Sequence, residues 1–181
     1  MPELRRHRDA GSTGHRRLAF AIAAAVLLAD QLTKQLATRL LADGPVHVLG
    51  GLHLQLYRNF AGPGGHWAGH TVAISTFTVL AALALGVVVA RARIDRVGAI
   101  ALGLFLGGAL GNGLDRLLRA PGPLRGGVVD WLAPSARGGS MNLADLALNA
   151  GVLLLLAAAL LAARPQRRRR RPVDPDAAAP R

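Results

Sequence analysis

The chain has 181 residues, of which 51% are hydrophobic and only 4% aromatic, and its mean hydropathy is +0.32. This length allows one domain, and the concentration of leucine and alanine in long runs excludes an ordinary soluble protein. The sequence contains no cysteine. Disulfide bonds, thiolate catalysis and cysteine-ligated zinc are therefore excluded as well.

The net charge is +12, from 22 Lys+Arg against 10 Asp+Glu. The arginines flank the apolar runs instead of forming one surface, which indicates membrane topology and not nucleic-acid binding. We therefore expect no nucleic-acid partner. The basic groups are Arg5, Arg6, Arg8, Arg16 and Arg17 before the first run, Arg91, Arg93 and Arg96 between two runs, and Arg164 with 167–171 after the last.

Four segments are long enough to cross a bilayer at about 20 residues per crossing. The positive-inside rule then puts both termini and the 91–96 loop in the cytoplasm. We expect an all-α membrane protein of four transmembrane helices with a small extracytoplasmic β element. The expected parts are a cytoplasmic basic arm at 1–17, spans at about 18–40, 71–90, 97–118 and 144–163, extracytoplasmic loops at about 41–70 and 119–143, and a disordered basic cytoplasmic tail at 164–181.

The first outer loop has the alternation of a β-strand. Leu52, Leu54 and Leu56 alternate with polar residues that include His53 and Gln55. Because side chains of a strand point to opposite faces in turn, the leucines should face the core or the membrane, and His53 and Gln55 should face water. The two glycines at 50–51 separate this segment from "VHVL" and predict a hairpin turn.

The first and third spans carry charged residues at one end. Asp30 and Lys34 are four residues apart and can pair on one helix face; the alternative is a surface ion pair at the interface. Asn112, Asp115 and Arg116 follow a glycine-rich stretch that allows close helix packing. Here the alternative is a helix end whose charged groups merely extend to the interface.

The fourth span begins with Asn142, Asp145 and Asn149 in helical register. An ionisable group at membrane depth is costly and usually marks a functional site. We expect Asn142 to orient Asp145 or to bind substrate backbone, and Asn149 to form a helix–helix hydrogen bond. A further carboxylate, Asp130, lies between apolar residues just before this span, where a lone Asp is usually a turn residue.

The histidines raise the question of a metal. His66 and His70 are four residues apart, with His47 and His53 nearby, and this spacing permits a metal site on a helix. Glycine and proline make the region a loop, and no carboxylate is close in sequence. We therefore expect no metal.

Four blocks in order resemble the signature blocks of the lipoprotein signal peptidase (signal peptidase II) family, over roughly residues 18–163. The family patterns are approximately DQxTK, GNxxDR, GxVxDF and FNxAD. The blocks are "DQLTK" (30–34), "GNGLDR" (111–116), "GGVVD" (126–130) and "MNLAD" (141–145). The resemblance implies an intramembrane aspartyl protease with catalytic Asp130 and Asp145. It implies substrate-binding or supporting roles for Asn59, Asn112, Arg116, Asn142, Asp115, Asp30 and Lys34.

The sequence also departs from the family. "RNFAGPGGHW" keeps Asn59 but replaces the apolar-aromatic run that usually follows, so specificity and inhibitor response are open for the stretch up to Trp67. The segment between Asp115 and Asp130 looks longer than usual. Trp131 and Met141 stand where the family prefers phenylalanine.

Paired carboxylates suit hydrolysis, because two that lie close together share a proton and can act as acid and base. The resemblance implies removal of signal peptides from diacylglyceryl-modified prolipoproteins, by cleavage before the lipidated cysteine. It implies no cofactor, contact with membrane lipids, and a monomer in the bacterial inner (cytoplasmic) membrane with its active site toward the outer face.

Two other functions stay open at this point. One is a proton- or ion-coupled carrier that uses Asp30, Asp115 and Asp145 as relay sites. The other is a non-catalytic homologue acting as an assembly factor or an inhibitor decoy. Release of a free signal peptide from a lipidated precursor would distinguish the protease from both.

Overall fold

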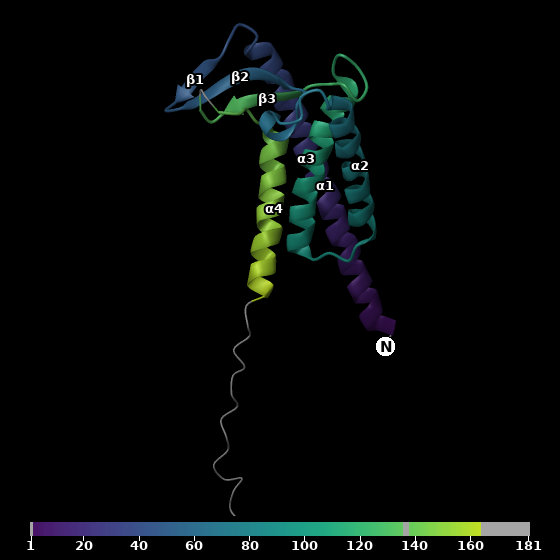
Figure 1. Cartoon of the computed structure of the whole chain (residues 1–181). Coiled ribbons are helices and arrows are strands. Elements are labelled where there is room, and N and C mark those ends of the chain that lie inside the picture. Colours follow the sequence, from purple (N-terminus) through teal and green to yellow (C-terminus); the bar gives the residue numbers. More distant parts are fainter. Residues whose placement is uncertain (1, 136–137, 164–181) are drawn as a thin grey trace, which may run out of the picture.

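The computed structural model describes residues 2–135 and 138–163, with side chains from residue 13 onward. It contains four long helices and one small sheet (Figure 1). The helices are α1 (Pro2–Leu40), α2 (Thr71–Arg91), α3 (Arg96–Leu118) and α4 (Leu143–Ala162), the strands are β1 (Val46–Leu49), β2 (Leu52–Asn59) and β3 (Val128–Ala133), and a short 3-10 turn spans Pro63–Gly65. The tail predicted at 164–181 lies outside the described residues.

All four helices are long and apolar enough to cross a membrane, with mean hydropathies from 1.2 to 2.5 over their best windows. Large apolar side chains cover their outer surfaces; Phe77 on α2 is 74% exposed and Leu160 on α4 is 71% exposed. Such apolar surfaces suit contact with lipid tails. The helices can lie within lipid because they satisfy their own backbone hydrogen bonds. The predicted fold class, four membrane helices with a small β element, is confirmed. The helix that contains the first span begins earlier than residue 18, at Pro2.

Helix α3 lies at the centre and packs against the other three helices. Its glycines permit this packing. A Cβ at Gly103 would lie 2.7 Å from the carbonyl oxygen of Ala19, and one at Gly107 would lie 2.6 Å from the Cβ of Val26, both on α1. On the opposite side, a Cβ at Gly108 would collide with α4. The glycine-rich stretch thus brings α1 and α4 onto α3 at backbone distance.

The sheet is antiparallel in the order β1-β2-β3 and lies across one end of the helices (Figure 1). The β1–β2 hairpin turns at residues 50–51, as predicted, with Gly50 at φ 58°, where glycine is favoured. β2 pairs with β3 so that Tyr57 lies opposite Asp130 and Asn59 opposite Val128. The end of β2 and the middle of β3 therefore meet above the helices.

The expected division of β2 into an apolar and a water-facing side is wrong. His53 and Gln55 are half-buried, as are the leucines that alternate with them. The Gln55 amide donates to the Ser140 hydroxyl at 2.8 Å, and the His53 ring makes an edge contact with His47 at 5.0 Å. The segment before α4 and the neighbouring strand thus cover a face for which sequence alternation predicts solvent.

The end opposite the sheet gathers basic residues. Arg16 on α1 donates to the Ala90 carbonyl at 2.8 Å, and the His15 Nδ1 lies 3.0 Å from the Ile94 carbonyl oxygen. Hydrogen bonds from His15 and Arg16 therefore connect this part of α1 to the last turn of α2 and to the connection between α2 and α3. Figure 1 places the last turn of α4 at this same end.

Candidate active site

The start of α4 holds Asp145 through a capping box. Asn142 is the N-cap: its side-chain oxygen accepts from the Asp145 backbone N–H at 3.0 Å, and the Asp145 carboxylate accepts from the Asn142 backbone N–H at 3.1 Å. This reciprocal pair satisfies two otherwise unpaired donors at the helix start. The sequence N-x-x-D therefore fixes the position of one carboxylate through local hydrogen bonds.

The same asparagine reaches the second carboxylate. The Asn142 side-chain NH₂ donates to Asp130 Oδ1 at 2.6 Å, and Asn59 donates to Asp130 Oδ2 at 3.2 Å. Asn112 on α3 donates to Asp145 Oδ1 at 2.8 Å. Both carboxylates are thus held by side-chain amides, and Asn142 contacts both of them.

The environment of Asp130 favours its protonated form. Asp130 is 1% exposed, and burial raises its pKa to about 6, with the nearby negative charge of Asp145 acting in the same direction. The hydrogen bonds from Asn142 and Asn59 lower the pKa but do not offset these effects. Asp130 therefore exchanges its proton closer to neutral pH than an ordinary carboxyl group does.

A second group of charges lies between α1 and α3. The Lys34 Nζ lies 2.8 Å from Asp30 Oδ2 and 3.0 Å from Asp115 Oδ2, and the three side chains are fully buried. Arg119 adds a bond from Nε to Asp115 Oδ1 at 2.6 Å. The alternative of a surface ion pair between Asp30 and Lys34 is therefore wrong, because helix packing encloses the pair.

This buried cluster is tied to the amide groups. Lys34 donates to Asn112 Oδ1 at 2.9 Å, and the other end of that amide donates to Asp145. Asp30 accepts from the backbone N–H of Ala144 at 2.9 Å, which anchors the first turn of α4. The cluster therefore positions Asp145 from two directions.

Arg116 does not extend to the membrane interface, as the alternative for this helix end had suggested. It is 3% exposed, and its guanidinium donates to the Gly126 carbonyl at 3.4 Å. The ion-pair partners of Asp115 are Lys34 and Arg119, not its neighbour Arg116. Arg116 thus supports the turn that leads into β3, the strand that carries Asp130.

Two residues of the cluster were not predicted from the sequence. Arg119 stands four residues after Asp115, so the i,i+4 rule could have found it. Gln31 donates to Asp30 at 3.3 Å, to Asp115 at 3.2 Å and to the Gly111 carbonyl at 3.1 Å. Its position inside the DQLTK block was the available signal.

Asn149 does not form the helix–helix hydrogen bond predicted for it. Its side chain is exposed and makes no hydrogen bond with residues 2–135 or 138–163. The residues of α4 that face α3 are Ala144, Ala147 and Gly151, which are buried. Asn149 lies outside that face, which is why the predicted partner is missing.

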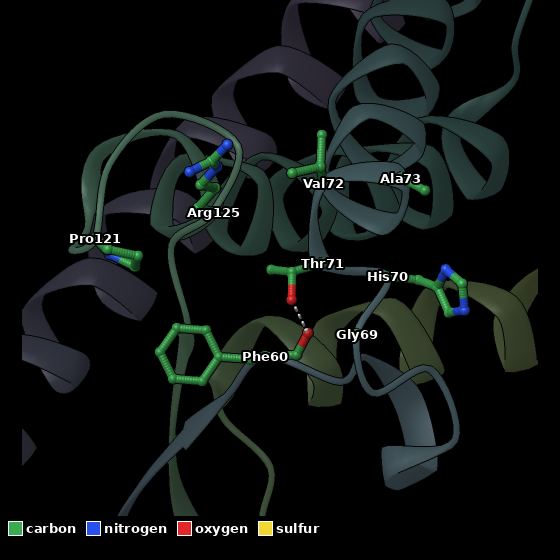
Figure 2. A pocket seen from close by; sticks show the side chains of 8 residues that line it. All are labelled: Phe60, Gly69, His70, Thr71, Val72, Ala73, Pro121 and Arg125. Atoms are coloured by element: carbon green, nitrogen blue, oxygen red, sulfur yellow. Dashed lines mark hydrogen bonds between the residues drawn. The ribbon is translucent and has the colours of Figure 1, made fainter.

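A cavity of about 680 Å³ opens at the start of α2, beside the chain that carries Asn59 (Figure 2). The Thr71 hydroxyl donates to the Phe60 carbonyl at 3.0 Å across its middle. The Phe60 ring also lies close to Gly127, where a Cβ would come within 2.8 Å of it. The lining residues are Phe60, Gly69, His70, Thr71, Val72, Ala73, Pro121 and Arg125.

Within the described residues, no three His, Cys, Asp or Glu side chains converge as metal ligands do. His66 and His70 are both exposed. The polar groups that do converge are carboxylates and amides, a set that suits acid–base chemistry on a bound peptide.

Comparison with known proteins agrees with the sequence blocks. The family described as "Signal peptidase (SPase) II" matches residues 22–161. The lipoprotein signal peptidase of Mycobacterium avium (strain 104) is 39% identical over 150 residues, covering 73% of this chain and 79% of that protein. That of Rhodococcus jostii (strain RHA1) is 40% identical over 146 residues, covering 77% and 70%.

A solved bacterial membrane enzyme, determined by the in meso method, has the same fold. It superposes with a TM-score of 0.68 at 25% identity and covers 86% of this chain and 94% of its own. None of these comparisons supports the carrier or the assembly-factor alternative. The family match covers more than half of the chain, and the relatives agree with it. The chain therefore belongs to the signal peptidase II family.

Proposed function

We propose that this chain is an aspartic endopeptidase that removes signal peptides from prolipoproteins, with Asp130 and Asp145 as its catalytic pair. The observation that carries the proposal is the bridge made by Asn142, which caps Asp145 and donates to Asp130 at 2.6 Å. Among the described residues, the hydrogen-bond partners of these two carboxylates are amides. Amides fix position without neutralising charge, so the pair keeps the freedom to exchange protons.

In the proposed mechanism the raised pKa of Asp130 makes it the acid and leaves Asp145 as the base. A water molecule attacks the scissile carbonyl carbon while Asp145 takes its proton and Asp130 gives its own to the carbonyl oxygen. Collapse of the tetrahedral intermediate breaks the C–N bond. The amine leaves with the proton that Asp145 had taken, and the proton on the intermediate's hydroxyl returns to Asp130.

The remaining predicted residues act as supports. Asn112 and Asn142 orient Asp145, Asn59 orients Asp130, and the cluster of Lys34 with its carboxylates holds the start of α4. Arg116 secures the turn before β3 through the Gly126 carbonyl. The mechanism draws on side chains and water, and no cofactor takes part.

The curated relatives are named lipoprotein signal peptidases, and we propose the corresponding substrate for this chain. It is a prolipoprotein carrying a diacylglyceryl group, cut before the lipidated cysteine. The lipid chains would lie along the apolar outer surfaces of the helices, among membrane lipids. We propose that residues 18–163 form the protease domain and that the monomer is the active form.

For topology, we propose a multi-pass protein of the bacterial cytoplasmic membrane with both termini and the 91–96 connection in the cytoplasm. The support is the clustering of Arg91, Arg93 and Arg96 at the end opposite the sheet, since cytoplasmic loops are rich in arginine. The active site then faces the outer side. A reporter that is active only outside the cytoplasm should be silent when fused after Arg171, and activity there would contradict this topology.

The test of function uses purified protein in liposomes with a precursor in two forms, lipidated and unlipidated. We expect release of the signal peptide from the lipidated form and little from the other. The control is Asp145→Asn, which should insert normally and release nothing. Wild-type protein that binds the lipidated precursor without cleaving it would instead favour a non-catalytic homologue.

A further inference from the structure

Asn149 is a polar residue on an apolar surface, one helical turn from Asp145. The rise of α4 puts its Cα about 6 Å from that of Asp145 along the helix, and about 9 Å beyond the first residue of the helix. Its exposed neighbours on α4 are apolar: Leu146 is 40% exposed, Leu153 65% and Leu156 55%. The amide therefore projects where lipid tails surround the helix.

An amide in hydrocarbon without a partner is unfavourable, because neither water nor lipid tails satisfy its donors and acceptor. In the described ranges no side chain or backbone group satisfies Asn149. A partner from outside the chain would remove the cost.

The substrate has the complementary problem. To reach Asp130 and Asp145, the peptide near the scissile bond must leave its helical conformation, which exposes backbone N–H and C=O groups within the membrane. The side-chain amide of Asn149 offers one donor group and one acceptor, the complement of a peptide unit. Asn149 lies on the flank of α4 that carries Asp145, and not on the buried Ala144–Gly151 face. A peptide that is bound at the pair and extends along this flank would pass Asn149.

We infer that Asn149 binds the backbone of the signal peptide within the membrane, about two residues before the scissile bond. The spacing follows from the 6 Å separation and a rise of about 3.3 Å per extended residue. This inference rests on the proposed function and adds a binding contact to it. Asn149 is a substrate-binding residue and takes no part in proton transfer.

The first experiment compares kinetics on the lipidated precursor. Asn149→Leu should raise KM about tenfold with kcat nearly unchanged, since a contact made equally in the ground and transition states affects KM alone. Asn149→Gln, which keeps the amide, should recover part of the loss. The control is Leu160→Ala, because Leu160 is 71% exposed near the other end of α4, and this change should leave KM unchanged.

The second experiment changes the substrate. Replacing the peptide bond two residues before the scissile bond with an ester removes the N–H group. For the wild-type enzyme, the ester substrate should raise KM about as much as the Asn149→Leu change does with the normal substrate. For Asn149→Leu, the ester and the normal substrate should have the same KM, because the contact is already lost. A purely structural role of Asn149 would not respond to one atom of the substrate. If the ester and Asn149→Leu raised KM independently, so that their combined effect were the product of the two, the inference would be overturned.

The third experiment places a photo-crosslinker at position 149 in the Asp145→Asn background, which retains uncleaved substrate. The expected product joins the enzyme to the signal peptide just before the cleavage site. Crosslinks only to lipid or only to a second copy of the chain would overturn the inference. Failure of the wild-type enzyme to release any signal peptide would defeat the proposed function itself, whereas active enzyme with an unchanged KM in Asn149→Leu would defeat this inference alone.

Discussion

Two pairs of carboxylates lie at the same end of the helices, and their partners differ. Asp30 and Asp115 share Lys34, and Asp115 also binds Arg119, so cations neutralise the pair. Asp130 and Asp145 are held by asparagine side chains and by the backbone N–H of Asn142. A buried carboxylate beside a cation is costly to separate from that cation, which suits a structural role. A buried carboxylate beside amides is fixed in place only, and it remains able to take or give a proton.

The Asn112 side chain contacts both regions. Asn112 accepts from Lys34 at 2.9 Å and donates to Asp145 at 2.8 Å. Lys34 therefore sets the orientation of the Asn112 amide, and this amide in turn positions Asp145. The comparison predicts that changes in the first pair affect folding first, and that changes in the second pair affect activity first.

The largest expected effect is on the second pair. Asp130→Asn and Asp145→Asn keep the shape of the side chain and remove the shared proton. Each should lower signal-peptide release by about 10⁴-fold or more, and the double variant should be no worse, since residues that act as one unit are not additive. Release is measured on lipidated precursor in liposomes. Strong turnover by either variant would move the catalytic role to Asp115 or Asp30.

The first pair should respond in the opposite way. Lys34→Met leaves two buried carboxylates without their common cation, a change that costs about 3–5 kcal/mol of folding stability. Folded yield and thermal unfolding in detergent should fall before any specific kinetic defect is seen. The control is Arg39→Met on the same helix, because Arg39 is exposed. Normal stability in Lys34→Met would contradict the structural role of the cluster.

Asp130 should make the protein less stable as pH rises. Its folded pKa of about 6 exceeds the usual 3.8, so the folded state binds more protons between these values and loses stability as pH rises through them. The loss is about 3 kcal/mol for a shift of this size. Asp130→Asn should therefore be more stable than wild type at pH 7, and this advantage should shrink toward pH 4. Thermal unfolding at both pH values tests the sign.

The smallest effect is expected at Asn59. Asn59→Ala removes one hydrogen bond to Asp130, of 3.2 Å, and should lower kcat/KM about tenfold. The bond favours the ionised form, so its loss raises the pKa of Asp130 further. Because Asp130 acts as the acid, the fall of activity at high pH should move to higher pH. A shift to lower pH would show that Asp130 works as the base.

The sequence by itself determined the features that depend on neighbours along the chain. The apolar runs predict four membrane helices, the glycines at 50–51 predict the hairpin, and the spacing of Asn142 and Asp145 suits a helix start. Hydrophobic length, turn conformation and capping are local properties, and they survive in any tertiary context that allows a helix or a hairpin. The four sequence blocks identified the family for the same reason, since each block is a short local pattern.

Only the tertiary structure decided which polar groups meet. Lys34 and Asn112 are separated by 78 residues, and their contact depends on how closely the glycines of α3 let the helices approach. Asn59 and Asp130 are separated by 71 residues, and the pairing of β2 with β3 brings them together. Packing likewise buried the Asp30–Lys34 pair, covered one face of β2, and left Asn149 without the partner that its spacing suggests. The burial and the partners of a side chain depend on segments that are far apart in the sequence, so a short stretch of sequence cannot predict them.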